Sequence, residues 1–93
     1  MPYIKEDDRM QFEDAINDVV GCILEETSET SRAGMLNFVI SSLIAQLLDA
    51  EGVTYNRLNG YMGVLTCAQL ELYRRMAAPY EDKKAHVNGD VYR

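Results

Sequence analysis

Several features that enzymes need are missing from this sequence of 93 residues. It has one histidine, His86, and two cysteines, Cys22 and Cys67, which form no Cys-x-x-Cys motif. A Ser-His-Asp triad needs a histidine beside a nucleophile, and a structural zinc site needs four close ligands. No glycine-rich phosphate loop and no Glu-x-x-His pair occurs either. We therefore expect no enzyme activity, no catalytic residue, no metal site and no cofactor, and we expect both cysteines to be reduced thiols in a helical core.

Long apolar runs are also missing. The most apolar stretch, residues 35–48, is interrupted by Ser and Gln, so we expect no membrane span. The N-terminal residues are acidic and lack the apolar segment of a secretion signal, which predicts a cytoplasmic protein.

Positive charge is scarce, and the net charge is −6 at pH 7. Nine of the fifteen acidic side chains lie in residues 1–29, whereas the last third of the chain is slightly basic. An acidic protein repels a polyanionic duplex, so we expect no binding to double-stranded nucleic acid. A small anion remains compatible with the basic C-terminal third.

The residues that are present repeat with the period of an α-helix in three segments. They predict helices over residues 6–27, 32–50 and 54–78. Gly52 is the expected closing residue of the second helix, and Thr54 is the expected N-cap of the third. Pro79 is expected to stop the third helix and to leave a polar tail over residues 79–93.

The fold class is therefore all-α: one domain over residues 1–93, a three-helix bundle-like structure with an ordered C-terminal tail. A chain this short is marginal as a monomer, and its wide apolar faces predict self-association as a dimer or higher oligomer. Two glycines inside the third helix, Gly60 and Gly63, indicate a tight helix crossing within the chain or with a second copy. The expected core consists of Phe12, Ile16, Val20, Ile23, Leu36, Val39, Ile40, Leu43, Leu47, Leu58, Leu65 and Leu72.

The strongest polar pattern surrounds the end of the third helix. Glu71 precedes Arg75 by four residues, which favours an ion pair and leaves Arg74 free for a ligand. Because Pro79 should turn the chain, Tyr80 and Lys84 are expected to fold back toward Arg74. Arginine offers a planar fork for phosphate, and tyrosine offers a ring for stacking. The expected ligand-binding residues are Arg74, Tyr80, Lys84, Arg75, Tyr73, Asn88 and Asp90. A salt-bridged helix end and a protein–protein hot spot are the open alternatives.

The same residues carry a resemblance. The sequence resembles a family of small, functionally uncharacterised proteins found in bacteriophages and some prokaryotic genomes. The matching elements are Met1-Pro2-Tyr3-Ile4 followed by Arg9, and residues 36–40, 63–67, 71–75, 78–84 and 88–92. The resemblance implies a phage-type setting, which would place the protein in the host cytoplasm, and it implies no activity.

For function, we expect a non-enzymatic phage-type protein that sequesters a small anionic ligand, and a nucleotide signal used in host defence fits best. This would be a counter-defence role. The alternative is a protein–protein inhibitor of a host factor that uses the acidic first helix or the C-terminal tail. A third class is an accessory enzyme subunit or a structural phage protein. A ligand-binding protein should place Arg74, Arg75 or Lys84 in a concave pocket, whereas an inhibitor should show a flat or convex apolar patch.

Overall fold

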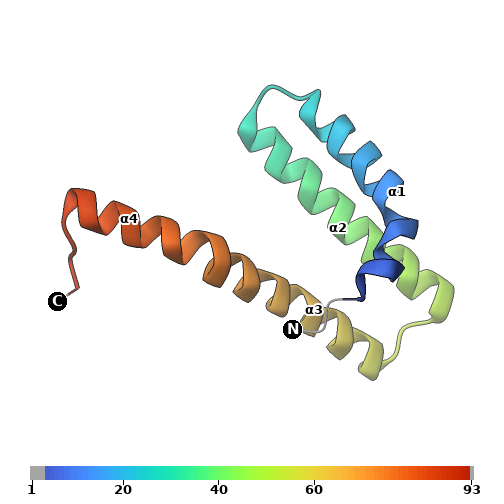
Figure 1. Cartoon of the computed structure of the whole chain (residues 1–93). Coiled ribbons are helices and arrows are strands. Elements are labelled where there is room, and N and C mark those ends of the chain that lie inside the picture. Colours follow the sequence, from blue (N-terminus) through green and yellow to red (C-terminus); the bar gives the residue numbers. More distant parts are fainter. Residues whose placement is uncertain (1–3, 93) are drawn as a thin grey trace. The chain divides into compact units, whose positions relative to one another are not determined.

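The computed structural model describes residues 4–92, and helices joined by short connections, with no strand, make up this part of the chain (Figure 1). Its helices are α1 (Glu6–Leu24), α2 (Glu29–Glu51), α3 (Tyr55–Leu72) and α4 (Ala78–Asn88), and a π-helical turn, η1 (Tyr73–Ala77), joins α3 to α4 without a break. Counted as continuous rods these are three helices, so the predicted all-α class is confirmed. Met1, Pro2 and Tyr3 of the N-terminal motif lie outside the described residues.

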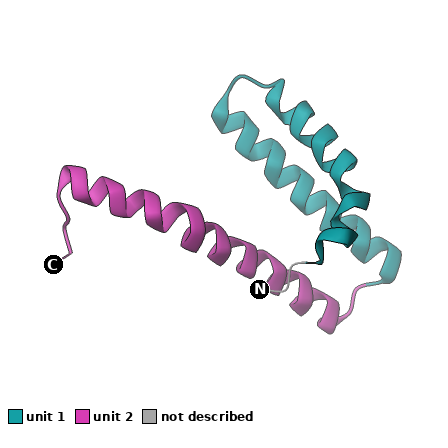
Figure 2. Ribbon diagram, in the orientation of Figure 1, with its two compact units in different colours: residues 1–52 teal, residues 53–93 magenta. Residues whose placement is uncertain are grey.

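By its internal contacts the chain divides into two units, residues 1–52 and 53–93 (Figure 2). The first unit is a hairpin of α1 and α2. The second unit is the long helix that α3, η1 and α4 form together. The contacts group the chain into a hairpin and a long helix, and the single domain over residues 1–93 stays a prediction.

The hairpin turns at a short polar connection. The Ser28 hydroxyl accepts the Ser31 N–H at 3.4 Å and so caps α2, which therefore begins three residues before the expected start. The Arg32 guanidinium donates from Nε to the Glu26 carbonyl at 2.6 Å, and Nη2 lies 3.5 Å from the Leu24 carbonyl. These bonds satisfy backbone acceptors at the end of α1. They also explain why α1 ends at Leu24 rather than at residue 27.

The connection between α2 and α3 matches the predicted caps. Gly52 has a φ of 95°, which favours glycine, and its N–H donates to the Leu48 carbonyl at 2.7 Å. The Thr54 hydroxyl accepts the Arg57 N–H at 3.2 Å. The predictions for Gly52 and Thr54 are both confirmed.

Pro79 does not end the third helix, so the predicted polar tail over residues 79–93 is wrong. Proline lacks an N–H, and its ring clashes with a carbonyl one turn earlier in a regular helix. The turn before Pro79 is a wide π turn, in which the Ala78 N–H donates to the Tyr73 carbonyl five residues back. The wide turn makes room for the ring, and α4 continues to Asn88, where Gly89 adopts a φ of 92°.

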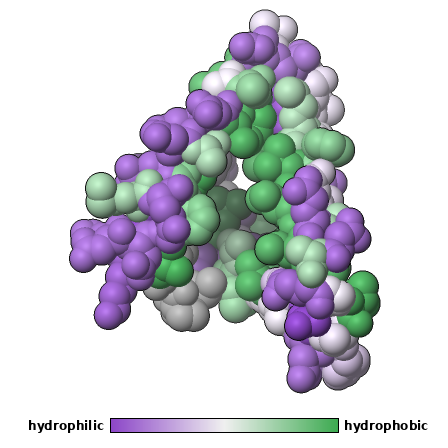
Figure 3. Space-filling view, turned by 90° about the vertical axis from the view of Figure 1, so that its right-hand side faces the viewer, coloured by the Kyte–Doolittle hydropathy of each residue, from purple (hydrophilic) through white to green (hydrophobic). Residues whose placement is uncertain are grey.

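No residue of the described chain is buried, so the predicted core does not form within either unit alone. Ile23 and Val39 are half-buried, and the other ten expected core residues are exposed. The physical reason is that a helix buries its apolar stripe only against other elements, and neither unit has enough of them. Figure 3 shows hydrophobic residues at the surface beside hydrophilic ones.

The glycine stripe of α3 has no close neighbour within its own unit, residues 53–93. An added Cβ at Gly60 or Gly63 would meet no other heavy atom within 4 Å. The helix that carries these glycines therefore makes no close contact with them inside its own unit, and the tight crossing stays a prediction.

α2 is long and apolar enough to cross a membrane by length and composition, with a mean hydropathy of 1.4. The average tolerates the interrupting Ser and Gln residues, and the expectation that no segment spans a membrane stays a prediction. Core helices of soluble proteins meet the same criterion, so it does not by itself assign α2 to a membrane.

Replacing Pro79 with alanine should regularise the helix. Alanine restores an N–H donor and removes the ring, and proline costs up to about 3 kcal/mol relative to alanine inside a helix. We expect Pro79→Ala to raise the midpoint of thermal unfolding and the helical signal at 222 nm. A lower midpoint would show that Pro79 is an unstrained first-turn residue of α4 that the helix needs.

Candidate functional site

An ion pair at the junction of α3 and η1 joins Glu71 to Arg74. Nη2 of Arg74 lies 3.1 Å from Oε1 and 3.3 Å from Oε2 of Glu71. The prediction that Arg75 takes this role and leaves Arg74 free is wrong. Side chains three and four residues apart are both neighbours on a helix, and here the closer one reaches both carboxylate oxygens. The hydrogen bonds to the Glu71 carboxylate come from Arg74 and not from Arg75.

The two arginines also act on the charge of Glu71. The hydrogen bond from Arg74 lowers the pKa of the Glu71 carboxyl below its ordinary value of 4.5, and partial desolvation opposes this. The positive charges of Arg74 and Arg75 lower the pKa further. Glu71 is therefore ionised at neutral pH and balances part of the positive charge of the Arg74-Arg75 pair.

A second contact brings Tyr80 and Lys84 together on α4. Nζ of Lys84 lies 5.5 Å from the centroid of the Tyr80 ring, within the range of a cation–π interaction. The Tyr80 side chain is 61% exposed, so the ring remains open to a further partner.

The two pairs do not form one pocket within the chain. Tyr80 was expected to fold back toward Arg74, but both residues lie on one continuous helix. Six residues separate them, a rise of about 9 Å at 1.5 Å per residue. The expectation of a shared site made by a chain reversal is wrong, because Pro79 does not reverse the chain.

The remaining predicted residues lie at the edges of these pairs. Tyr73 opens η1 and is 53% exposed. Asn88 is the last residue of α4. The Asp90 carboxylate accepts the Tyr92 N–H at 2.9 Å, so it stabilises the turn that follows the helix.

The π turn coincides with the polar motif. Tyr73, Arg74 and Arg75 are three of the five residues of η1. A π turn is rare inside α-helices, and such turns are frequent at functional sites. No sequence pattern predicted this turn; the proline six residues after Tyr73 is the only local signal.

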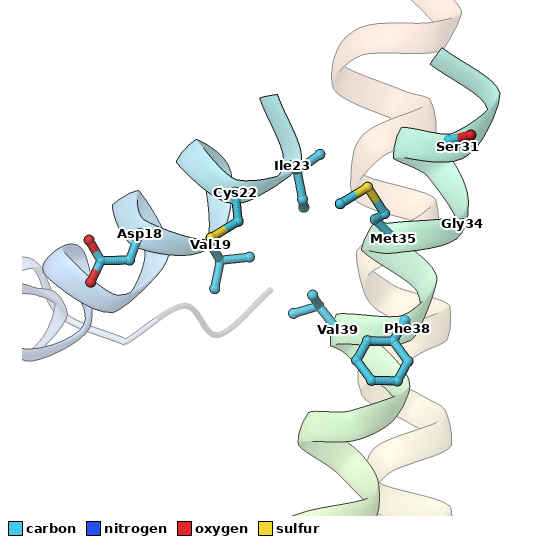
Figure 4. Close-up of a pocket in the computed structure, with 9 residues that line it drawn as sticks. All are labelled: Asp18, Val19, Cys22, Ile23, Ser31, Gly34, Met35, Phe38 and Val39. Atoms are coloured by element: carbon cyan, nitrogen blue, oxygen red, sulfur yellow. The ribbon is translucent and has the colours of Figure 1, made fainter. Parts of the chain in front are cut away.

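Sequence reasoning missed a groove of about 600 Å³ in the hairpin (Figure 4). In the close-up, Ile23 of α1 and Met35 and Val39 of α2 lie at the space between the helices, and the Asp18 carboxylate points away from α2. Cys22 is exposed and lines this groove, so the expectation of a core thiol is wrong for it. Small residues such as Gly34 leave the space open. Their position in the sequence is the feature from which this groove could have been predicted.

A smaller groove of about 310 Å³ lies in the same unit. Val20 and Leu24 line it from α1, and Arg32, Ala33 and Leu36 line it from α2. Neither groove includes Arg74, Arg75 or Lys84. Both grooves are therefore apolar surfaces, distinct from the polar pairs on the long helix.

These features define an all-α protein with a helical hairpin and a charged, aromatic C-terminal helix. The model of a family described as a domain of unknown function, DUF6899, matches residues 1–91, and the chain belongs to this family. No curated protein and no solved structure matches the chain.

The pKa of Glu71 tests the geometry at η1. Because this pKa is lowered in the folded protein, the ion pair contributes stability above the ordinary value of 4.5 and loses it as pH falls through the folded value. We expect Arg74→Ala to raise the pKa of Glu71 more than Arg75→Ala does, since the hydrogen bond from Arg74 is the largest cause of the lowered pKa and Arg75 acts through its charge. A pH titration of the carboxyl carbon by NMR measures both, and a larger shift in Arg75→Ala would contradict this assignment.

Proposed function

We propose that the chain is a non-enzymatic phage-type protein that binds and sequesters a small anionic ligand, and that a nucleotide fits its side chains best. The observation that carries the proposal is the Tyr80–Lys84 pair, an exposed ring with an ammonium group 5.5 Å from its centroid. A ring stacks on a base and an ammonium group binds phosphate, so the pair offers both halves of nucleotide recognition.

The η1 turn supplies the second part of the proposed site. Arg74 is held by Glu71, so we assign the phosphate-binding role to Arg75. Tyr73 offers another exposed ring next to it. Asn88 and Asp90 remain polar neighbours at the far end of α4. The ligand would contact one or both of these clusters rather than a closed pocket.

Membership of the DUF6899 family assigns no activity. The resemblance to phage proteins supports a counter-defence role in the host cytoplasm, where a sequestered nucleotide signal could not reach its receptor.

A specific observation favours the alternative function, an inhibitor that binds a host protein. The hairpin has apolar grooves, and these do not contain the basic residues of the long helix. An exposed apolar surface with a strongly acidic first helix suits a protein partner better than a small anion.

A thermal-shift screen against nucleotides and cyclic oligonucleotides tests the proposal. A ligand at 100 times its Kd stabilises the folded state by about 2.7 kcal/mol, which is several degrees for so short a chain. If no nucleotide shifts the midpoint, the inhibitor becomes the better interpretation.

Lysine variants then test the site. Lys84→Ala should weaken binding of the nucleotide found in the screen by about 10- to 150-fold, the range for a charged hydrogen bond of roughly 1.5–3 kcal/mol. Lys83→Ala is the matched control, because it removes the same charge from an exposed neighbour that does not stack on Tyr80. Equal losses in titration calorimetry would show a general charge effect and contradict the proposed site.

A further inference from the structure

One turn of α4 carries charged side chains on every side. Glu81, Asp82, Lys83 and Lys84 are consecutive residues of this helix, and all four are exposed. Consecutive side chains on a helix point about 100° apart, so four of them cover a full turn. Burying any side of this turn would take a charge out of water, which is costly without a partner. The turn therefore faces solvent by its composition alone.

The Tyr80–Lys84 pair offers one ring face and one ammonium group. Nζ of Lys84 lies over the Tyr80 ring, 5.5 Å from its centroid, and so occupies one of the two faces. Tyr80 is 61% exposed, which leaves the other face open. A base stacks on an open aromatic face, and an ammonium group binds phosphate as a compact point charge. The pair thus has room for one base and a single positive charge for its phosphate.

The other basic side chains of the long helix do not converge on this point. Lys83 is the neighbour of Lys84 in sequence, so the two side chains point about 100° apart. Arg74 binds the Glu71 carboxylate at 3.1 Å. Arg75 lies nine residues before Lys84, a rise of about 13 Å along the helix. A second phosphate attached to the first would therefore find no second cation of this helix beside it.

Negative groups lie close to the ammonium instead. Glu81 precedes Lys84 by three residues, the spacing of neighbours on a helix surface. α4 ends at Asn88, one turn beyond Lys84, and the last carbonyls of a helix carry negative partial charge. These groups leave the contact between one phosphate and the ammonium in place, and they repel the further charges of a longer phosphate chain.

We infer that this site is selective for a nucleotide with a single phosphate group and discriminates against nucleoside diphosphates and triphosphates. The inference rests on the proposed function, since it takes the ligand to be a nucleotide and names the class of nucleotide. The Tyr80 ring binds the base, and the Lys84 ammonium binds the phosphate. Glu81 is the specificity-determining residue, because its carboxylate repels additional phosphates.

Titration calorimetry at low ionic strength, without divalent cations, tests the selectivity. The probes are the 5′-mono-, di- and triphosphates of adenosine, guanosine, cytidine and uridine. A like charge about 5 Å away in water weakens binding by about fourfold. For the base that binds best, we expect the Kd to rise by about this factor with each phosphate added to the monophosphate. A triphosphate that binds as tightly as the monophosphate, or more tightly, overturns the inference and leaves nucleotide binding itself intact.

Variants of two neighbouring acidic residues test the role of Glu81. Glu81→Gln should lower the ratio of the triphosphate Kd to the monophosphate Kd, because it removes the repelling charge. Asp82→Asn is the matched control: it removes the same charge two residues before Lys84, a spacing at which helix side chains do not face each other. Both Kd values are measured within one variant, so a change in folding cancels in their ratio. An equal fall in the two variants would contradict the assignment to Glu81.

Two kinds of nucleotide carry a single phosphate group, and cyclic 3′,5′-monophosphates of the same four nucleosides separate them. Tighter binding of the cyclic form identifies a phosphodiester as the preferred group, and tighter binding of the 5′ form identifies a monoester. Either result supports the inference if the di- and triphosphates bind more weakly. Absence of binding by every nucleotide overturns the proposed function, and this inference fails with it.

Discussion

The structure depends on one constraint: no residue of the described chain is buried. Ordering a chain costs about 1–2 kcal/mol per residue in backbone entropy, and full burial of a large apolar side chain returns roughly 1.5–3 kcal/mol. A hairpin and a single helix cannot recover this cost with half-exposed side chains. The caps at Ser28 and Thr54 set where two helices begin, and the ion pair of Glu71 joins neighbouring side chains. These local contacts contribute little to the free energy of folding. The folded state therefore relies on apolar contacts beyond those that either unit makes within itself.

Local chemistry could be predicted from the sequence. The periodic apolar residues predicted the helices. Gly52 was recognised as a cap because a positive φ favours glycine, and Thr54 was recognised because a hydroxyl side chain accepts a hydrogen bond at a helix N-terminus. The effect of Pro79 was predicted wrongly, since the rule that proline stops a helix holds for a regular turn, and the π turn before it accommodates the ring. Burial could not be predicted either. The pattern that contains Leu43 shows which residues avoid water, and it does not show which chain covers them.

The candidate site shows the same division. Sequence spacing placed Glu71 within reach of both arginines, and only the geometry shows that Arg74 takes the carboxylate. The stacking of Lys84 on Tyr80 follows from their four-residue spacing once the helix is known to continue through Pro79. The hairpin grooves arise from how two helices meet, which no single motif encodes. The proposed ligand site and the hairpin grooves lie in different units.

Wide apolar faces on so short a chain predict self-association, and the most direct test of this account is the dependence of thermal unfolding on protein concentration. If apolar residues are covered by a second copy, folding is coupled to association, and each tenfold rise in concentration adds about 1.4 kcal/mol to the stability of the assembled state. The unfolding midpoint of the wild type should then rise by several degrees over about a hundredfold range of concentration. A midpoint that stays constant over that range would show that a single chain buries its own core, and it would contradict the predicted self-association.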